Sequence, residues 1–209
     1  VADRFLVISR RGEGSSGVAL AVHDTDSEDP DRELVLKVAR TESAGRRLSL
    51  EADVLRALDH RRVVRLIAGP LDVGNRRALL LTDAGKETLA TRLSKEGRAT
   101  VGQLEQYGSQ LLEAMIYLES QGVFHRDIKP DNILVDQDGT ATLLDFGTVR
   151  AAQSKDTHTI LGTLAYVAPE QRMGRLHDSR VDVYALGVTL HEAISQNAAN
   201  SRPTAVIRP

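Results

Sequence analysis

The chain has 209 residues, of which 41% are apolar and 27% are charged, enough for one large domain or two small lobes that share a core. Its formal net charge of −2, its 3% of aromatic residues and its lack of tryptophan argue against nucleic acid or a membrane surface as the main partner. The chain has no cysteine, which excludes disulfides, thiolate metal sites and a cysteine nucleophile.

The first part of the chain is predicted to form mainly strands. Two apolar runs around a glycine-rich turn indicate a β-hairpin at 4–24, and an acidic stretch with a proline indicates a solvated loop at 24–31. Further apolar runs predict three more strands, at 33–40, 62–69 and 76–84. Apolar residues at helical spacing predict a helix over 44–60.

The second part is predicted to be mainly helical. A helix over 100–122 begins with Thr100 and Gln103 at the spacing of a capping box, and Gly122 is its expected stop. Its apolar positions are Val101, Leu104, Leu111, Leu112, Met115 and Leu118. The run 178–195 is apolar on most of its circumference and is expected to be a buried helix, whereas 196–209 has little periodicity.

These patterns predict an α+β fold with two lobes. The first lobe, 1–84, would be small and β-rich with one major helix, and the second, 85–209, would be mainly helical. The join falls near 82–87, where a strand ends at polar and glycine residues. Because a cleft between two lobes is the usual place for a ligand, we expect the ligand there.

Glycines stand at the G-x-G-x-x-G spacing in the first predicted hairpin, at Gly12, Gly14 and Gly17. Glycine lets backbone amides approach an anionic ligand without obstruction by a side chain. A plain tight hairpin explains the same three residues equally well. A dinucleotide-binding fold is disfavoured, because there the glycines open a helix, whereas here a second strand follows.

A lysine interrupts the apolar run of the third strand. Lys37 could be a solvent-exposed lysine on an edge strand, or it could hold phosphate oxygens as a directed charge. Glu51, in the following helix, is a possible ion-pair partner, although alone it is typical of a surface helix residue.

The stretch HRDIKPDN at 125–132 combines several groups suited to chemistry. Asp127 could orient a hydroxyl and accept its proton, and Lys129 could offset charge on a phosphoryl group. Asn132 and Asp145, the latter directly after an apolar run, offer the hard oxygen ligands that suit Mg²⁺ shared with a phosphate. The alternative is a charged turn with an Asx cap.

Together these motifs resemble those of the protein kinase superfamily, and they occur in the family's order over nearly the whole chain. The matches are the glycine-rich loop, the third-strand lysine, its helix partner, the catalytic loop, the metal-binding DFG motif and the APE motif that ends the activation segment. In that order they are Gly12, Gly14 and Gly17, Lys37, Glu51, 125–132, Asp145–Gly147 and Ala168–Glu170. Asp182 matches the buried aspartate that braces the catalytic loop. The resemblance implies the bilobal kinase fold.

The resemblance also implies a nucleotide pocket. Ala19 would line it, Leu81 would guard its back, and Asp83 and Ala84 would present hinge backbone to adenine. Four residues match the apolar spine that links the lobes in active kinases, although each is compatible with an ordinary core position: Leu55, Leu66, His125 and Phe146.

The activation segment resembles that of bacterial serine/threonine kinases of this superfamily. Thr163 matches the threonine that bridges the catalytic aspartate and lysine. Thr157 and Thr159 are candidate phosphorylation sites, and a phosphate there could pair with Arg126. An unmodified polar loop is the alternative.

Two departures from the family pattern stand out. Thr82 occupies a hinge position that is acidic in many kinases. Beyond Asp182 only 27 residues remain, so the helical lobe is expected to be shortened, and no arginine equivalent to the usual partner of Glu170 is evident. A truncated chain, a naturally short domain or completion by a partner would each explain this.

The resemblance implies a serine/threonine protein kinase that uses ATP and Mg²⁺, or Mn²⁺ in its place, and acts on protein substrates. A non-catalytic, kinase-like interaction module is the alternative, disfavoured because Lys37, Asp127 and Asp145 are all kept. A small-molecule phosphotransferase of related fold is a third. No apolar run suggests a signal peptide or a membrane segment, and the lack of cysteine fits a reducing compartment, so we expect a cytoplasmic location.

Overall fold

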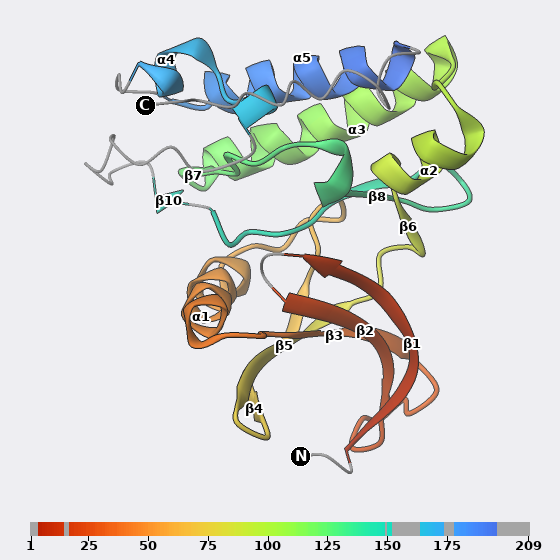
Figure 1. The fold of residues 1–209 in the computed structure, drawn as a ribbon, viewed down its shortest axis with the longest axis vertical. Helices are drawn as coiled ribbons and strands as arrows, with labels where there is room; N and C mark the ends of the chain where they lie inside the picture. Colours follow the sequence, from red (N-terminus) through yellow and green to blue (C-terminus); the bar gives the residue numbers. More distant parts are fainter. Residues whose placement is uncertain (1–3, 15–16, 149, 152–163, 174–177, 196–209) are drawn as a thin grey trace, which may run out of the picture.

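The computed structural model describes residues 4–14, 17–148, 150–151, 164–173 and 178–195 (Figure 1). The first half of the chain forms a curved antiparallel sheet with one helix, and the second half is mainly helical. The α+β, two-lobed fold expected from the sequence is therefore confirmed.

The sheet has five strands in the order β1-β2-β3-β5-β4. Their bounds are β1 Phe5–Gly14, β2 Gly17–Asp24, β3 Glu33–Val38, β4 Leu66–Val73 and β5 Arg76–Thr82. Because β3 lies at the centre, Lys37 is not on an edge strand. The fourth strand begins at Leu66, four residues later than the apolar run at 62–69 predicts.

Helix α1, Glu42–Arg56, packs against β4 and β5. Its N-terminus is capped by Thr41, whose hydroxyl accepts a hydrogen bond from the amide of Ala44 at 3.1 Å. Its buried face carries Leu48 and Leu55 together with one charged residue, Glu51. A buried carboxylate among apolar side chains needs a polar or charged partner, and residues of the candidate active site provide one.

The helical half contains four helices in the described residues. They are α2 Leu89–Glu96, α3 Val101–Ser120, α4 Pro169–Arg172 and α5 Arg180–Ile194. Short strands precede α2 and separate α3 from α4, forming the sheets β6-β8-β9 and β10-β7. Their bounds are β6 Glu87–Thr88, β7 Val123–Phe124, β8 Ile133–Val135, β9 Ala141–Leu143 and β10 Arg150–Ala151.

Helix α3 follows the sequence prediction at both ends but not on every face. Both hydrogen bonds of the Thr100–Gln103 capping box are present, and Gly122 follows the helix with a φ of 68°. Val101 and Leu112, two of the apolar positions at helical spacing, are however exposed. The buried face instead uses Tyr107 and small residues such as Ala114.

Helix α5 is only partly buried. Val181, Asp182 and Leu186 lie inside, but Val183 and Tyr184 are 51% and 40% exposed. The expectation of a helix buried all round is therefore wrong for the described residues. The exposed face is as apolar as the buried one, so hydropathy alone could not tell them apart.

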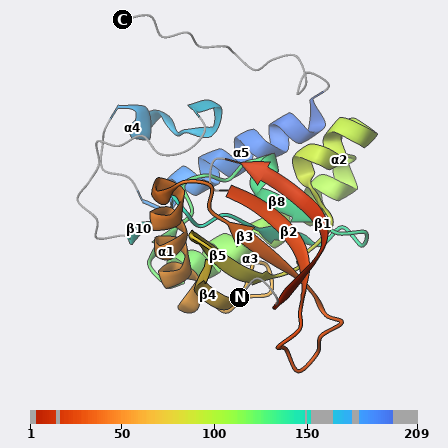
Figure 2. The same ribbon diagram turned by 60° about the horizontal axis from the view of Figure 1, so that its bottom comes forward.

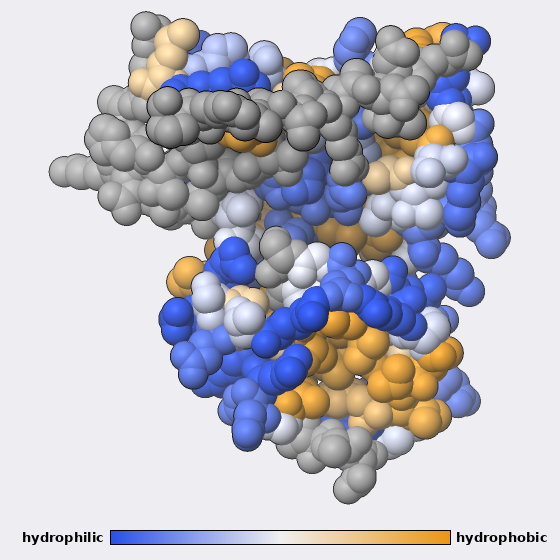
Figure 3. Space-filling view, viewed as in Figure 1, coloured by the Kyte–Doolittle hydropathy of each residue, from blue (hydrophilic) through white to orange (hydrophobic). Residues whose placement is uncertain are grey.

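One apolar cluster runs through both halves. It joins Leu48 and Leu55 of α1 to Leu111 of α3, to Leu186 of α5 and to Phe146, which lies between β9 and β10. A second cluster lies on the other face of the sheet, where Val22, Leu34 and Leu36 meet Ala78 and Leu80, and Figure 3 shows apolar surface over the sheet half. Within the described residues, no helix has the length and apolar character needed to cross a membrane.

Candidate active site

Lys37 lies between two carboxylates. Its Nζ donates to both oxygens of Glu51, at 2.9 and 2.8 Å, and to Oδ1 of Asp145, at 3.0 Å. Glu51 is fully buried, and the side chain of Lys37 is 13% exposed. Burial alone would lower the pKa of Lys37, but the charges of Glu51 and Asp145 outweigh it and the pKa is raised. The lysine is therefore a fixed cation at the centre of the molecule.

The DFG segment is held against α1. Asp145 has a φ of 60°, and its Oδ1 accepts a hydrogen bond from the amide of Gly147 at 3.3 Å. The amide of Phe146 donates to Oε1 of Glu51 at 3.3 Å. One buried carboxylate thus binds both the lysine of β3 and the backbone beside Asp145, which ties the two lobes together.

The stretch 125–132 forms a network around Asp127. Asn132 Nδ2 donates to the Asp127 carbonyl at 2.8 Å and to its Oδ2 at 2.9 Å. Lys129 Nζ donates to the same Oδ2 at 2.8 Å. The amide of Leu144 donates to the carbonyl of Asn132 at 2.9 Å, so this loop is bonded directly to the strand that leads to Asp145.

Asp182, in the first turn of α5, supports this loop by binding its backbone. Its two carboxylate oxygens accept hydrogen bonds from the amides of His125 and Arg126, both at 2.7 Å. Arg126 has a φ of 64°, a backbone conformation that is unfavourable for residues other than glycine. Burial raises the pKa of Asp182, and the His125 ring and the two amides oppose that rise.

Two of the four spine residues predicted from the family resemblance are in direct ring contact. The rings of His125 and Phe146 stand edge to face with centroids 4.8 Å apart. Leu55 and Phe146 belong to the main core cluster, and Leu66 packs against it. His125 also contacts the backbone through its Nε2, 2.8 Å from the carbonyl oxygen of Leu144.

A cleft of about 1340 Å³ lies between the two halves. It is lined by most of the predicted catalytic, nucleotide-binding and metal-binding residues, namely Gly12, Gly14, Gly17, Ala19, Lys37, Glu51, Leu81, Lys129, Asn132 and Asp145. Residues of the β1–β2 hairpin, β8, α2 and α5 all contribute to this lining, and Figure 1 shows the end of the hairpin directed toward the helical half. Figure 2 shows the same ribbon from a second direction. Asp83, Ala84 and Asp127 do not line it, although Asp127 contacts it through Lys129 and Asn132.

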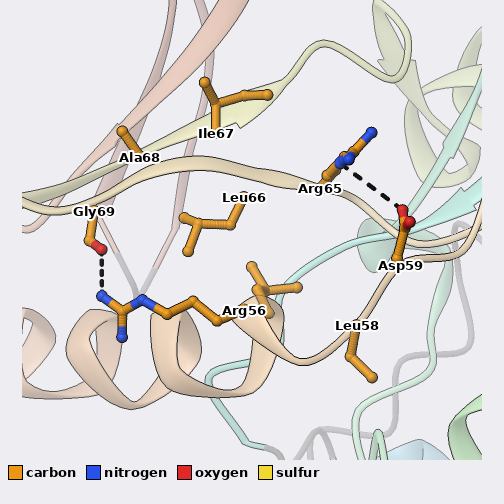
Figure 4. A pocket seen from close by; sticks show the side chains of 9 residues that line it. Arg56, Leu58, Asp59, Arg65, Leu66, Ile67, Ala68 and Gly69 are labelled. Carbon is orange, nitrogen blue, oxygen red and sulfur yellow. Dashed lines mark hydrogen bonds and ion pairs between the residues drawn. The ribbon is translucent and has the colours of Figure 1, made fainter.

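A second pocket of about 410 Å³ lies elsewhere, between the end of α1 and β4 (Figure 4). Arg56 extends along the helix and donates to the carbonyl of Gly69, and Arg65 pairs with Asp59 at 3.8 Å. Of the predicted site residues, this pocket has only the spine residues Leu55 and Leu66 in its lining. The larger cleft is therefore the candidate active site.

The three glycines of the hairpin differ in their surroundings. Gly17 has a φ of 142°, and a Cβ placed there would lie 2.1 Å from the carbonyl oxygen of Val38. Among the described residues, nothing lies within 4 Å of a Cβ placed on Gly12 or Gly14. Gly17 is thus required by the close approach of β3, whereas the other two leave open backbone facing the cleft.

Gly17→Ala is therefore expected to lower the free energy of unfolding by about 2 kcal/mol, because the added methyl meets backbone and the conformation is strained. Gly14→Ala, which meets nothing, is the matched control and should change it by about 0.5 kcal/mol or less. Urea unfolding of both variants measures the difference. Equal stability of the two would show that β3 does not constrain Gly17 in this way.

The sequence model of the protein kinase domain matches residues 5–205, which is most of the chain. The chain belongs to the protein kinase family. Members of this family use ATP and Mg²⁺. The cleft and the motif residues around it therefore occupy the part of the fold where the family carries out phosphoryl transfer.

Several kinases are similar in sequence. The probable kinase PglW of Streptomyces coelicolor is 36% identical over 93% of this chain and 14% of its own length. Aurora kinase A-A of Xenopus laevis is 38% identical over 76% of the chain and 40% of its own length. The probable serine/threonine-protein kinase PknB of Lactococcus lactis is 29% identical over 93% of the chain and 32% of its own length. The chain thus spans less than half the length of these relatives.

Some predicted kinase residues lie outside the described part of the chain. These are Thr157, Thr159 and Thr163. Glu170 is described and is half-buried.

One kinase-cleft residue has no sequence signal. Arg11 lines the cleft and binds Asp83, 72 residues away. An arginine beside a glycine-rich turn is typical of a solvated strand end, and only the folded structure brings it to a carboxylate.

Proposed function

We propose that this chain is a serine/threonine protein kinase domain that transfers the γ-phosphoryl group of Mg-ATP to a serine or threonine hydroxyl of a protein. The observation that carries the proposal is the arrangement of two charged groups of residues along one cleft. Lys37, paired with Glu51 and Asp145, lies toward the sheet side, and Lys129 and Asn132, which bind Asp127, lie on the helical side.

The residues of the first lobe suit the nucleotide. Gly12 and Gly14 leave backbone amides open to phosphate, and Lys37 supplies a fixed cation for phosphate oxygens. Leu81 and Ala19 form apolar walls. The backbone after β5, at 83–84, lies outside the cleft lining but between two residues that line it, Thr82 and Gly85, and would hold the adenine edge. The proposal divides the chain into a nucleotide-binding lobe at 1–84 and a catalytic lobe at 85–209.

Asn132 and Asp145 would hold the metal ion. Both line the cleft, and their backbones are joined through the hydrogen bond from Leu144 to Asn132. Their hard oxygen donors fit Mg²⁺, and Mn²⁺ shares this preference. When bound, the metal would offset negative charge on the phosphates.

Asp127 would orient the substrate hydroxyl and accept its proton. Its position is fixed by Asn132 and Lys129, which both donate to its Oδ2. Lys129 would then also lie beside the phosphoryl group as it transfers, where its charge is stabilising. These roles require positioning more than covalent chemistry, in keeping with phosphoryl transfer in this family.

The activation segment would regulate the domain. We propose Thr157 and Thr159 as phosphorylation sites, Arg126 as a partner for their phosphate, and Thr163 as a bridge between Asp127 and Lys129. Support comes from Arg126, which directly precedes Asp127 and has its amide fixed by Asp182. A phosphate that paired with its guanidinium would order the segment next to the catalytic loop.

The proposal is tested by intact mass spectrometry of the chain and of dephosphorylated casein after incubation with Mg-ATP. Transfer predicts mass increments of one phosphoryl group each with ATP and none with ADP. Increments on the chain that map to Thr157 or Thr159 would support regulation through these residues. Binding of Mg-ATP without any increment on either protein would contradict catalysis and favour a non-catalytic interaction module.

A further inference from the structure

Arg11 is the extra residue of a bulge in β1. Arg10 pairs with Leu20 and Gly12 pairs with Ala19, so Arg11 has no partner across the ladder. A bulge of this kind bends a strand and redirects the side chain of the extra residue. Among the described strands, β1 is the edge of the sheet and pairs only with β2. The hydrogen bonds to β2 alone therefore fix only weakly how far β1 lies from the other side of the cleft.

The redirected side chain reaches two carboxylates. Arg11 Nη2 donates to Oε1 of Glu33 and to Oδ2 of Asp83, both at 2.5 Å. Glu33 begins β3 and Asp83 follows the last residue of β5, and these two strand ends are paired, since Leu34 lies opposite Thr82. Without a cation between them, two like charges would face each other at the sheet end.

The contact also fixes the segment that leads from the sheet to the helical half. Oδ1 of Asp83 accepts a hydrogen bond from the amide of Gly85 at 3.1 Å, while Oδ2 binds Arg11. The arginine therefore joins the glycine-rich strand to the connection between the lobes. It does so from the lining of the cleft, with a side chain that is only 16% exposed.

We propose that Arg11 is a positioning residue for the nucleotide. Its guanidinium, anchored on Glu33 and Asp83, holds β1 over the cleft, and its aliphatic stem covers the base, as buried arginine stems cover apolar surface elsewhere. The inference rests on the proposed function, because it assumes that the cleft binds ATP. It assigns to Arg11 nucleotide affinity and not the transfer step, since the reacting groups are held by other contacts.

The test compares three variants by calorimetric titration with Mg-ATP. Arg11→Met keeps a stem of similar length and removes the charge, and we expect affinity to fall about tenfold with kcat within about twofold of the parent chain. Arg11→Lys should restore part of the affinity, because one amine can reach at least one carboxylate. Arg10→Met is the matched control, since Arg10 is the adjacent arginine, is 56% exposed and pairs with Glu13 on its own strand.

Amide hydrogen exchange without nucleotide gives a second readout. If the contact holds β1, its amides should exchange faster in Arg11→Met than in Arg10→Met. Unchanged ATP affinity in Arg11→Met would overturn the inference and leave the proposed function intact. Failure of the parent chain to bind Mg-ATP would overturn both, and equal loss of affinity in the two methionine variants would overturn the specific role of Arg11.

Discussion

Replacement of Asp127 by asparagine is expected to slow phosphoryl transfer by about a thousandfold while Mg-ATP affinity stays close to that of the parent chain. The amide is nearly isosteric but cannot accept the proton of a substrate hydroxyl. Asp127 does not line the cleft directly, and an asparagine oxygen can still accept the hydrogen bonds from Lys129 and Asn132, so the nucleotide contacts should survive. Single-turnover transfer and calorimetric titration measure the two quantities separately.

Asp138→Asn is the matched control for Asp127→Asn. Asp138 is an exposed residue of the turn between β8 and β9, so it should leave transfer unchanged. A rate for Asp127→Asn within about tenfold of the parent chain would show that Asp127 is not the proton acceptor, because general base catalysis contributes at least about a hundredfold. A parallel loss of rate and ATP affinity would assign it a structural role in the loop.

The sequence predicts best the residues whose character conflicts with their surroundings. Lys37 interrupts an apolar strand and Asp145 ends one, and both conflicts are resolved by contact with each other at 3.0 Å. The conflict can be seen without a structure because a buried charge needs a partner. Identifying the partner of Lys37 as Glu51 is harder, since a glutamate in a helix is ordinary, and it depended on the family's order of motifs.

Local sequence signals predict where a helix begins and ends, but not which of its faces is buried. Thr100 and Gln103 form their capping box because both partners lie within one turn. Helix α2 also has local signals at both ends, since Thr88 caps it and Gly97 ends it. With only eight residues, however, it is too short to show a clear helical period of apolar residues. The exposed face of α5 depends on what packs against it, and no pattern within the helix carries that information.

The contacts of Arg11 could not be predicted at all. They depend on the bulge between Arg10 and Gly12, which shifts the pairing by one residue. The pairing register of a hairpin is set by all of its paired residues and its turn. The residue type at one position therefore does not show that a bulge occurs there. For Asp182, the family resemblance predicts a role in bracing the loop but not its geometry, in which the amides of His125 and Arg126 both donate to the carboxylate and Arg126 has a positive φ.

Asp182→Ala is expected to lower the free energy of unfolding by about 4 kcal/mol, the largest stability effect that the described residues suggest. The substitution removes both acceptors at 2.7 Å and leaves the amides of His125 and Arg126 buried without them. Each unsatisfied buried donor costs about 1–3 kcal/mol. The strained backbone of Arg126 would also lose the contact that holds it. Asp31→Ala, in the exposed loop before β3, is the control and should change stability by about 0.5 kcal/mol or less.

The position of Asp182 makes its effect on activity separable from its effect on stability. The carboxylate contacts the backbone directly before Asp127 but neither Lys37 nor the glycine-rich strand. At a temperature where Asp182→Ala remains folded, transfer should fall more than Mg-ATP affinity, because the loop carrying Asp127 loses its support while the nucleotide contacts of the first lobe are retained. Single-turnover transfer and calorimetric titration decide this, and circular dichroism shows that the sample is folded. An Asp182→Ala variant as stable as Asp31→Ala would mean that the loop is held by the Asp127, Lys129 and Asn132 contacts alone.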